Sequence, residues 1–72
     1  MVNSNPLGAD ILIDGTYVGT TPARYLMVQP GSHELQLNMP SGAVRRTVVI
    51  GSTQANTFIW TGERWAISTR DL

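Results

Sequence analysis

The side chains that could carry acid–base or metal chemistry are few: one histidine, His33, five carboxylates and no cysteine. A catalytic base needs a nucleophile or an orienting acid beside it, and no motif in the sequence supplies either. On an extended strand Asp10 and Asp14 would lie roughly 13 Å apart, which is wider than a glycosidase pair requires. One histidine with scattered carboxylates is also a poor metal site. We therefore expect no catalytic residue, no cofactor and no metal, and structural roles for His33 and Asp14.

Two tryptophans are the side chains best suited to binding. Trp60 and Trp65 flank the stretch "WTGERW", which could fold as a hairpin with the two indoles opposite each other. Exposed indoles would form a platform for a sugar ring or a protein. Glu63 or Arg64 beside them would favour a protein, because Trp and Arg are enriched at interface hot spots. Buried indoles would instead be core or edge packing. The candidate partner-binding residues are therefore Trp60, Glu63, Arg64 and Trp65.

The glycines are better explained by turns than by a bound ligand. The spacing of Gly8, Gly15 and Gly19 does not match a dinucleotide or phosphate loop, and no helix is predicted after them. "DG" after an alternating run predicts a hairpin with a type I′ turn, and "PG" fits the centre of a type II turn. Structural roles in turns and at strand starts are assigned to Pro6, Gly8, Asp14, Gly15, Gly19, Pro22, Pro30 and Gly31.

Short strands must position these residues, because apolar residues alternate with polar ones and no ten-residue segment has helical spacing. Residues 24–28, "RYLMV", are rich in β-formers and are predicted as a strand. The last four residues, "TRDL", are expected to fray. The predicted strands cover residues 9–13, 16–18, 24–28, 32–38, 43–50, 55–60 and 65–69. The predicted inward-facing residues are Ile11, Ile13, Leu35, Leu37, Val48, Ile50 and Phe58.

Length and charge narrow the class of protein. With 72 residues, the chain is expected to form one domain over residues 1–72. The formal net charge is zero and the only adjacent cations are Arg45 and Arg46, so the electrostatic footprint of a nucleic-acid binder is missing. No apolar run approaches the ~20 residues that span a bilayer, and the N-terminus lacks the features of a secretory signal. We therefore expect neither nucleic-acid binding nor membrane insertion.

The ordered pattern of the first half resembles the PEGA domain family. The matching pieces are "PLGA" from Pro6, with Leu7 in place of the family's Glu, "DGTYVGTTP" from Asp14 and "PGSHEL" from Pro30. The resemblance is strongest over residues 2–37. It implies an all-β fold, a small antiparallel β-sandwich or open barrel, here of six to seven short strands. It also implies a bacterial or archaeal protein of the cell envelope or surface, and it assigns no catalytic residue.

The expected function is a non-catalytic interaction module, not an enzyme. It would bind a protein, or a glycan, within a larger surface, envelope or secretion-related protein. The alternative is a structural subunit of a particle, appendage or secretion apparatus. A domain this small has a thin core and would gain from burying its sheet edges against copies of itself. A protein partner or self-association is therefore the expected interaction.

Overall fold

Seven β-strands and no helix make up the structure, a computed structural model that describes residues 1–72. No element therefore has the length and apolar character of a membrane-spanning helix. The strands are β1 (Val2–Ser4), β2 (Asp10–Ile13), β3 (Thr16–Thr20), β4 (Gly31–Met39), β5 (Gly42–Ile50), β6 (Gln54–Trp60) and β7 (Trp65–Asp71).

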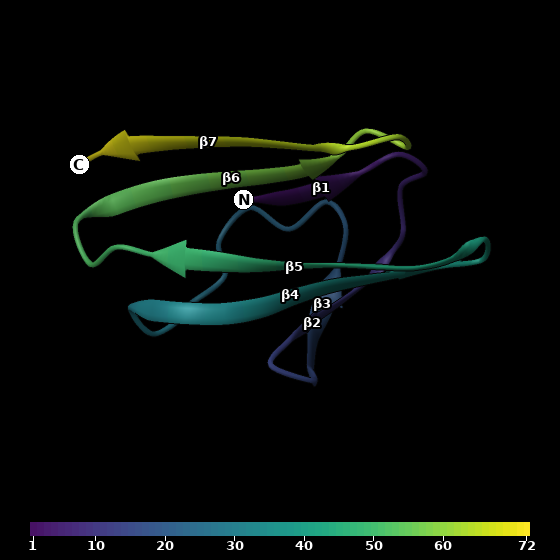
Figure 1. The fold of residues 1–72 in the computed structure, drawn as a ribbon, viewed down its shortest axis with the longest axis horizontal. Coiled ribbons are helices and arrows are strands. Elements are labelled where there is room, and N and C mark those ends of the chain that lie inside the picture. The colour runs from purple at the N-terminus through teal and green to yellow at the C-terminus, as the bar shows by residue number, and fades with distance from the viewer.

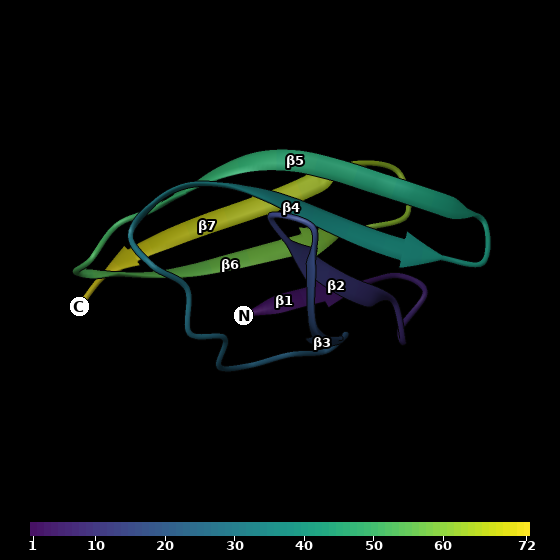
Figure 2. The same ribbon diagram turned by 90° about the horizontal axis from the view of Figure 1, so that it is seen from below.

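The strands form two sheets that pack face to face (Figures 1 and 2). One sheet has four strands in the order β3-β2-β4-β5, and the other has three in the order β1-β6-β7. This arrangement confirms the all-β fold of small sandwich type. All pairs are antiparallel except β1 with β6, which run parallel with Val2 opposite Phe58.

The residues at the turns determine how the strands are joined into hairpins. Asp14 and Gly15 join β2 to β3 with φ angles of 51° and 82°, so both central residues have the positive φ of a type I′ turn. Pro40 and Ser41 join β4 to β5, with Met39 opposite Gly42. The register of β2 against β3 shifts between Ile11 and Leu12, because Ile11 pairs with Gly19 and Leu12 with Tyr17. Val18 is therefore the extra residue of a β-bulge.

The core lies between the two sheets. Five of the seven residues predicted to face inward are buried there, and the other two, Ile13 and Ile50, are half-buried and pack against it. Val2 and Ala9 are the two buried apolar residues outside that predicted set. The buried apolar residues are Val2, Ala9, Ile11, Leu35, Leu37, Val48 and Phe58.

Two sequence-based expectations are wrong. Residues 24–28 are not a strand: they connect β3 to β4 of the same sheet without pairing, and only Ala23, just before them, forms a bridge, to Val2. The seventh strand is instead β1, a short segment without an alternating pattern of its own. The C-terminal residues are paired rather than frayed: β7 continues to Asp71, and the Leu72 N–H donates to the Thr53 carbonyl at 2.9 Å.

A chain of buried hydroxyls ties the family-like motif together. The Ala9 N–H donates to Thr21 Oγ1 at 2.9 Å, and Thr21 Oγ1 lies 2.7 Å from Ser4 Oγ. Ser4 Oγ in turn donates to the Pro6 carbonyl at 2.7 Å. Because Ser4 gives its only proton to Pro6, Thr21 must be the donor between the two hydroxyls. Ser4 and Thr21 are the only buried polar residues, and no buried side-chain polar atom lacks a partner.

Candidate functional site

The β6–β7 hairpin brings the two tryptophans together as the sequence suggested. Trp60 lies opposite Trp65, with ring centroids 5.6 Å apart and ring planes at 65°, an edge-to-face pair. Both side chains are half-buried and pack against the core. The pair is thus partly core and partly surface, and no flat double-indole platform is presented.

The turn between these tryptophans is ordered by Thr61. The Thr61 N–H donates to the Arg64 carbonyl at 2.9 Å, and Thr61 Oγ1 accepts from the Arg64 N–H at 3.2 Å. Glu63 and Arg64 are exposed at its tip, and neither forms an ion pair. The structure therefore places the four candidate binding residues in one hairpin end, with the charges pointing to solvent.

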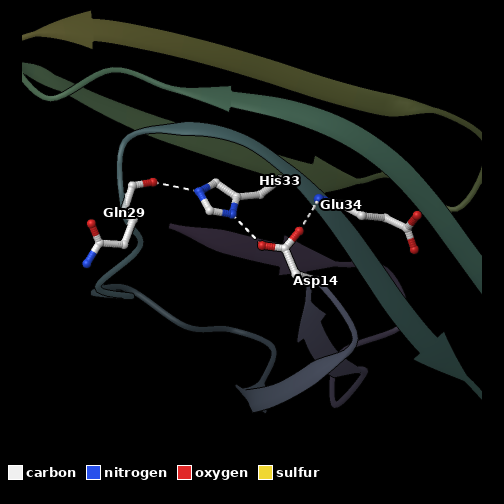
Figure 3. Close-up of polar contacts among 4 residues, drawn as sticks. All are labelled: Asp14, Gln29, His33 and Glu34. Atoms are coloured by element: carbon white, nitrogen blue, oxygen red, sulfur yellow. Dashed lines mark hydrogen bonds and ion pairs between the residues drawn. The ribbon is translucent and has the colours of Figure 1, made fainter.

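A second constellation, missed from the sequence, joins Asp14, His33 and Gln29 (Figure 3). His33 Nδ1 lies 2.5 Å from Asp14 Oδ2, and His33 Nε2 lies 2.6 Å from the Gln29 carbonyl oxygen. Asp14 Oδ1 accepts from the Glu34 N–H at 2.8 Å. The pairing of Ile13 with Leu35 produces this proximity, since it places the β2–β3 turn beside the start of β4. Only that register, which the motifs alone do not specify, could have revealed the pair.

Charge and hydrogen bonding shift the pKa values of both groups. The hydrogen bond to the Asp14 carboxylate, followed by that to the Gln29 carbonyl, raises the pKa of His33. The hydrogen bond from His33, followed by that from the Glu34 backbone, lowers the pKa of Asp14. Both ring nitrogens face acceptors, so the imidazolium satisfies the site best. We call this site the clamp, because His33 links Asp14 in the β2–β3 turn to the backbone of Gln29.

This geometry gives His33 little scope for proton transfer to a ligand. Nε2, the nitrogen that a catalytic base would use, is occupied by the Gln29 carbonyl. No group of three or more His, Cys, Asp or Glu side chains could hold a metal ion. The clamp is therefore best described as a structural ion pair.

A groove opens at the end of the sandwich, next to this clamp. Its volume is about 490 Å³, and its walls include Phe58 and Val48 of the core together with residues 24–28. A second hollow of about 450 Å³ lies on the other side of the same segment, against Val18. Between the two hollows Tyr25 is 92% exposed and Met27 is 100% exposed. No motif indicated this groove, because residues 24–28 were predicted to be a paired strand.

Comparison with known proteins gives one family. The PEGA domain model matches residues 1–61, which covers β1 to β6 and stops before β7. Neither a curated protein nor a solved structure matches the chain.

Proposed function

The chain belongs to the PEGA domain family, and from that premise we propose that it is a non-catalytic protein-binding module of a larger surface, envelope or secretion-related protein. The observation that carries the proposal is the cluster of exposed apolar side chains around residues 24–28. Tyr25 and Met27 are almost fully exposed, and Tyr17 and Val18 on the neighbouring edge strand β3 are 60% and 40% exposed. Clusters of this kind mark interaction sites, and Tyr and Met are enriched in interfaces.

A site-specific cross-linker tests the proposal. A photoreactive phenylalanine analogue would replace Tyr25, and in a matched chain it would replace Val49, which is 70% exposed on the outer face of β5. After irradiation in cells of the source organism, we expect one recurrent protein adduct at position 25 and none at position 49. Equal labelling at both positions, or none at either, would reject the protein-binding function.

Glycan binding has weaker support. An indole platform for sugar needs accessible ring faces, and Trp60 and Trp65 form an edge-to-face pair that packs against the core. If sugar nevertheless binds there, Trp65→Ala will abolish binding to a glycan array while the far-UV circular dichroism spectrum stays unchanged. Loss of the fold in that variant would instead assign Trp65 to packing.

The alternative, a structural assembly subunit, is favoured by the free sheet edges. β3 and β5 are edge strands of one sheet and β7 is an edge strand of the other, and β5 is nine residues long. Light scattering coupled to size exclusion over a wide concentration range separates the two functions. A concentration-independent monomer supports the binding module, whereas a closed oligomer or growing filament supports the assembly subunit.

A further inference from the structure

The three members of the clamp are held by the rest of the fold to different degrees (Figure 3). His33 lies in β4, which pairs with β2 on one side and with β5 on the other. Asp14 is bound twice to the same strand: its N–H donates to the Glu34 carbonyl at 2.9 Å, and its Oδ1 accepts from the Glu34 N–H at 2.8 Å. Gln29 instead belongs to the irregular connection between β3 and β4. Gln29 is therefore the member that can move without disturbing a strand pair.

Only the charged form of His33 can donate to both of its neighbours. The imidazolium carries two N–H groups, whereas the neutral ring carries one N–H and one lone pair. Nδ1 faces the Asp14 carboxylate and Nε2 faces the Gln29 carbonyl oxygen. The neutral ring keeps its N–H on Nδ1, because a hydrogen bond to a carboxylate is stronger than one to a neutral carbonyl. The lone pair of Nε2 then faces the carbonyl oxygen, so loss of the proton breaks the contact with Gln29 and keeps the contact with Asp14.

Asp14 is the only charged group that pairs with the His33 ring, and its hydrogen bond raises the pKa of His33 above the ordinary value of 6.5. The residues that β5 and β6 contribute to the groove beside His33 are uncharged. Glu34, the next residue of β4, projects to the opposite face of the strand. The other titratable or charged groups that line the groove with His33 are Arg24, Tyr25 and the amine of Met1.

The hollow of about 450 Å³ connects the clamp to the exposed apolar cluster, because residues of both line it. The lining residues shared in this way are Asp14, Gln29 and His33 of the clamp and Val18, Tyr25 and Met27 of the cluster. Gln29 is also only two residues from Met27 in the chain, so a displacement of its carbonyl moves the backbone that carries the cluster. The position of Tyr25 and Met27 therefore depends on the charge of His33.

We propose that the clamp is a pH-sensitive switch for the protein-binding surface around residues 24–28, which holds Gln29 while His33 is charged and releases it when His33 is neutral. Release lets residues 24–29 occupy other positions, so the surface is no longer preorganised and a protein partner binds less tightly as pH rises. The expected change in affinity is roughly fivefold, the effect of one hydrogen bond. This inference rests on the protein-binding function proposed above and adds the regulation of its site.

An NMR titration of the ¹³C,¹⁵N-labelled chain between about pH 5 and 9 tests the switch without a partner. The ring signals of His33 report its protonation, and the carbonyl ¹³C signal of Gln29 reports the hydrogen bond. We expect the Gln29 signal to shift with the same midpoint as the ring, and residues 25–29 to become more mobile above it. The Glu34 N–H, which stays bound to Asp14, should keep its slow exchange with solvent. A Gln29 signal that does not change through the His33 midpoint, or a simultaneous loss of protection at Glu34, would overturn the proposal.

Two variants assign the change to the clamp. Asp14→Asn should move the midpoint of both signals to lower pH, because the anion that favours the imidazolium is removed while Asn tolerates the positive φ of the turn. His33→Gln should make the Gln29 carbonyl signal independent of pH. Arg24→Gln, which removes a charge from the same groove, is the control and should keep the coupled shift. A Gln29 shift that persists in the His33→Gln chain would assign the change to another group and refute the switch.

The cross-linker at position 25 tests the effect on binding. The photoreactive chain is irradiated with a limiting amount of the partner that this adduct identifies, about two pH units below and above the His33 midpoint. We expect a roughly fivefold higher adduct yield at the lower pH, and no difference when the chain also carries His33→Gln. Equal yields at both pH values, with Gln29 released, would overturn the regulation and leave the protein-binding function standing. No adduct at either pH would reject the protein-binding function, whereas the NMR titration decides independently whether Gln29 is released.

Discussion

At the residue scale, the hydroxyl of Thr21 explains why the sequence pattern is spread over two segments. It accepts from the backbone of Ala9 and donates to Ser4, which in turn donates to Pro6. The "PLGA" turn and the "TTP" segment are therefore two sides of one hydrogen-bonded unit. The pattern that identifies the family is, at these positions, a requirement of the fold and not of a ligand site.

Replacing this hydroxyl tests that role. Thr21→Val keeps the shape but leaves the Ala9 N–H and the Ser4 hydroxyl short of partners in a buried place, so we expect a loss of about 1–3 kcal/mol in the free energy of unfolding. Thr20→Val, on an exposed neighbour, should change it by less than about 0.5 kcal/mol. Urea denaturation measures both. Equal effects would mean that the hydroxyl chain contributes nothing specific.

The His33–Asp14 clamp predicts how stability depends on pH. The raised pKa of His33 contributes stability that is fully present below its ordinary value of 6.5 and is lost as pH rises through the raised value. The lowered pKa of Asp14 contributes stability that is present above 3.8 and is lost as pH falls through the lowered value. The urea midpoint should therefore be highest between about pH 4 and 6.5.

Two variants assign this dependence to the clamp. His33→Gln should remove the decline above pH 6.5, and Asp14→Asn should remove most of the acid-side change while tolerating the positive φ of the turn. Arg64→Gln, at an exposed position outside the clamp, is the control. A urea midpoint of the His33→Gln variant that still falls with rising pH would show that another group is responsible.

At the element scale, β7 lies beyond the residues that the family model matches, and it pairs with β6 as a hairpin. Its closing pair, Trp60 and Trp65, is edge-to-face, an arrangement worth about 0.5–1.5 kcal/mol beyond the area it buries. A double-mutant cycle with Trp60→Leu and Trp65→Leu should therefore give a coupling energy of that size, measured by urea denaturation. A cycle that closes to zero would mean that the two indoles act independently.

The elements also show how far sequence reasoning can go. The Asp14–Gly15 hairpin, the alternation of β4 and the hairpin with Trp60 opposite Trp65 all follow from local pattern, and the structure contains them. Strand β1 could not be predicted from local pattern, because three residues are too few to show a period and its partner β6 is distant in the sequence. Residues 24–28 have the composition of a strand, but composition does not show whether a neighbouring edge is within reach.

Only part of the candidate site could likewise be predicted from the sequence. Proximity within one hairpin placed Trp60 and Trp65 together, since adjacent strands fix their own register. His33 and Asp14 come from different hairpins, and their contact depends on the register of β2 against β4. The groove is lined by segments that are distant in sequence, among them β1, residues 24–28 and the start of β6. Their relative positions are determined only when the chain folds.

At the scale of the whole molecule, the free edges must be protected from one another. Arg46 projects from β5 on the same face as Val44 and Val48, yet it is exposed because β5 lies at the sheet edge. Charged residues on edge strands oppose edge-to-edge association. Arg45 bonds to Gln36 of its own sheet at 2.9 Å, which leaves Arg46 as the cation without a partner on this edge.

We therefore predict that Arg46→Val promotes self-association. The substitution makes a continuous apolar row along β5, while the original chain should stay monomeric. Light scattering at increasing concentration measures the change, and Arg64→Val in the exposed turn is the control. A monomeric Arg46→Val chain would show that the edge is protected by its twist or by β7 and not by charge.

The parallel pairing of β1 with β6 also fixes the order in which the domain can be made. Val2 is synthesised before its partner Phe58, which follows more than fifty residues later in the chain. Closing so long a loop is entropically costly, and folding slows as contacts become more distant in sequence. Until β6 is made, the backbone of β1 can therefore pair only with Ala23, through the bridge from Val2. Folding of this domain is a late event in synthesis, and interruption before β6 leaves half of its core without a second sheet.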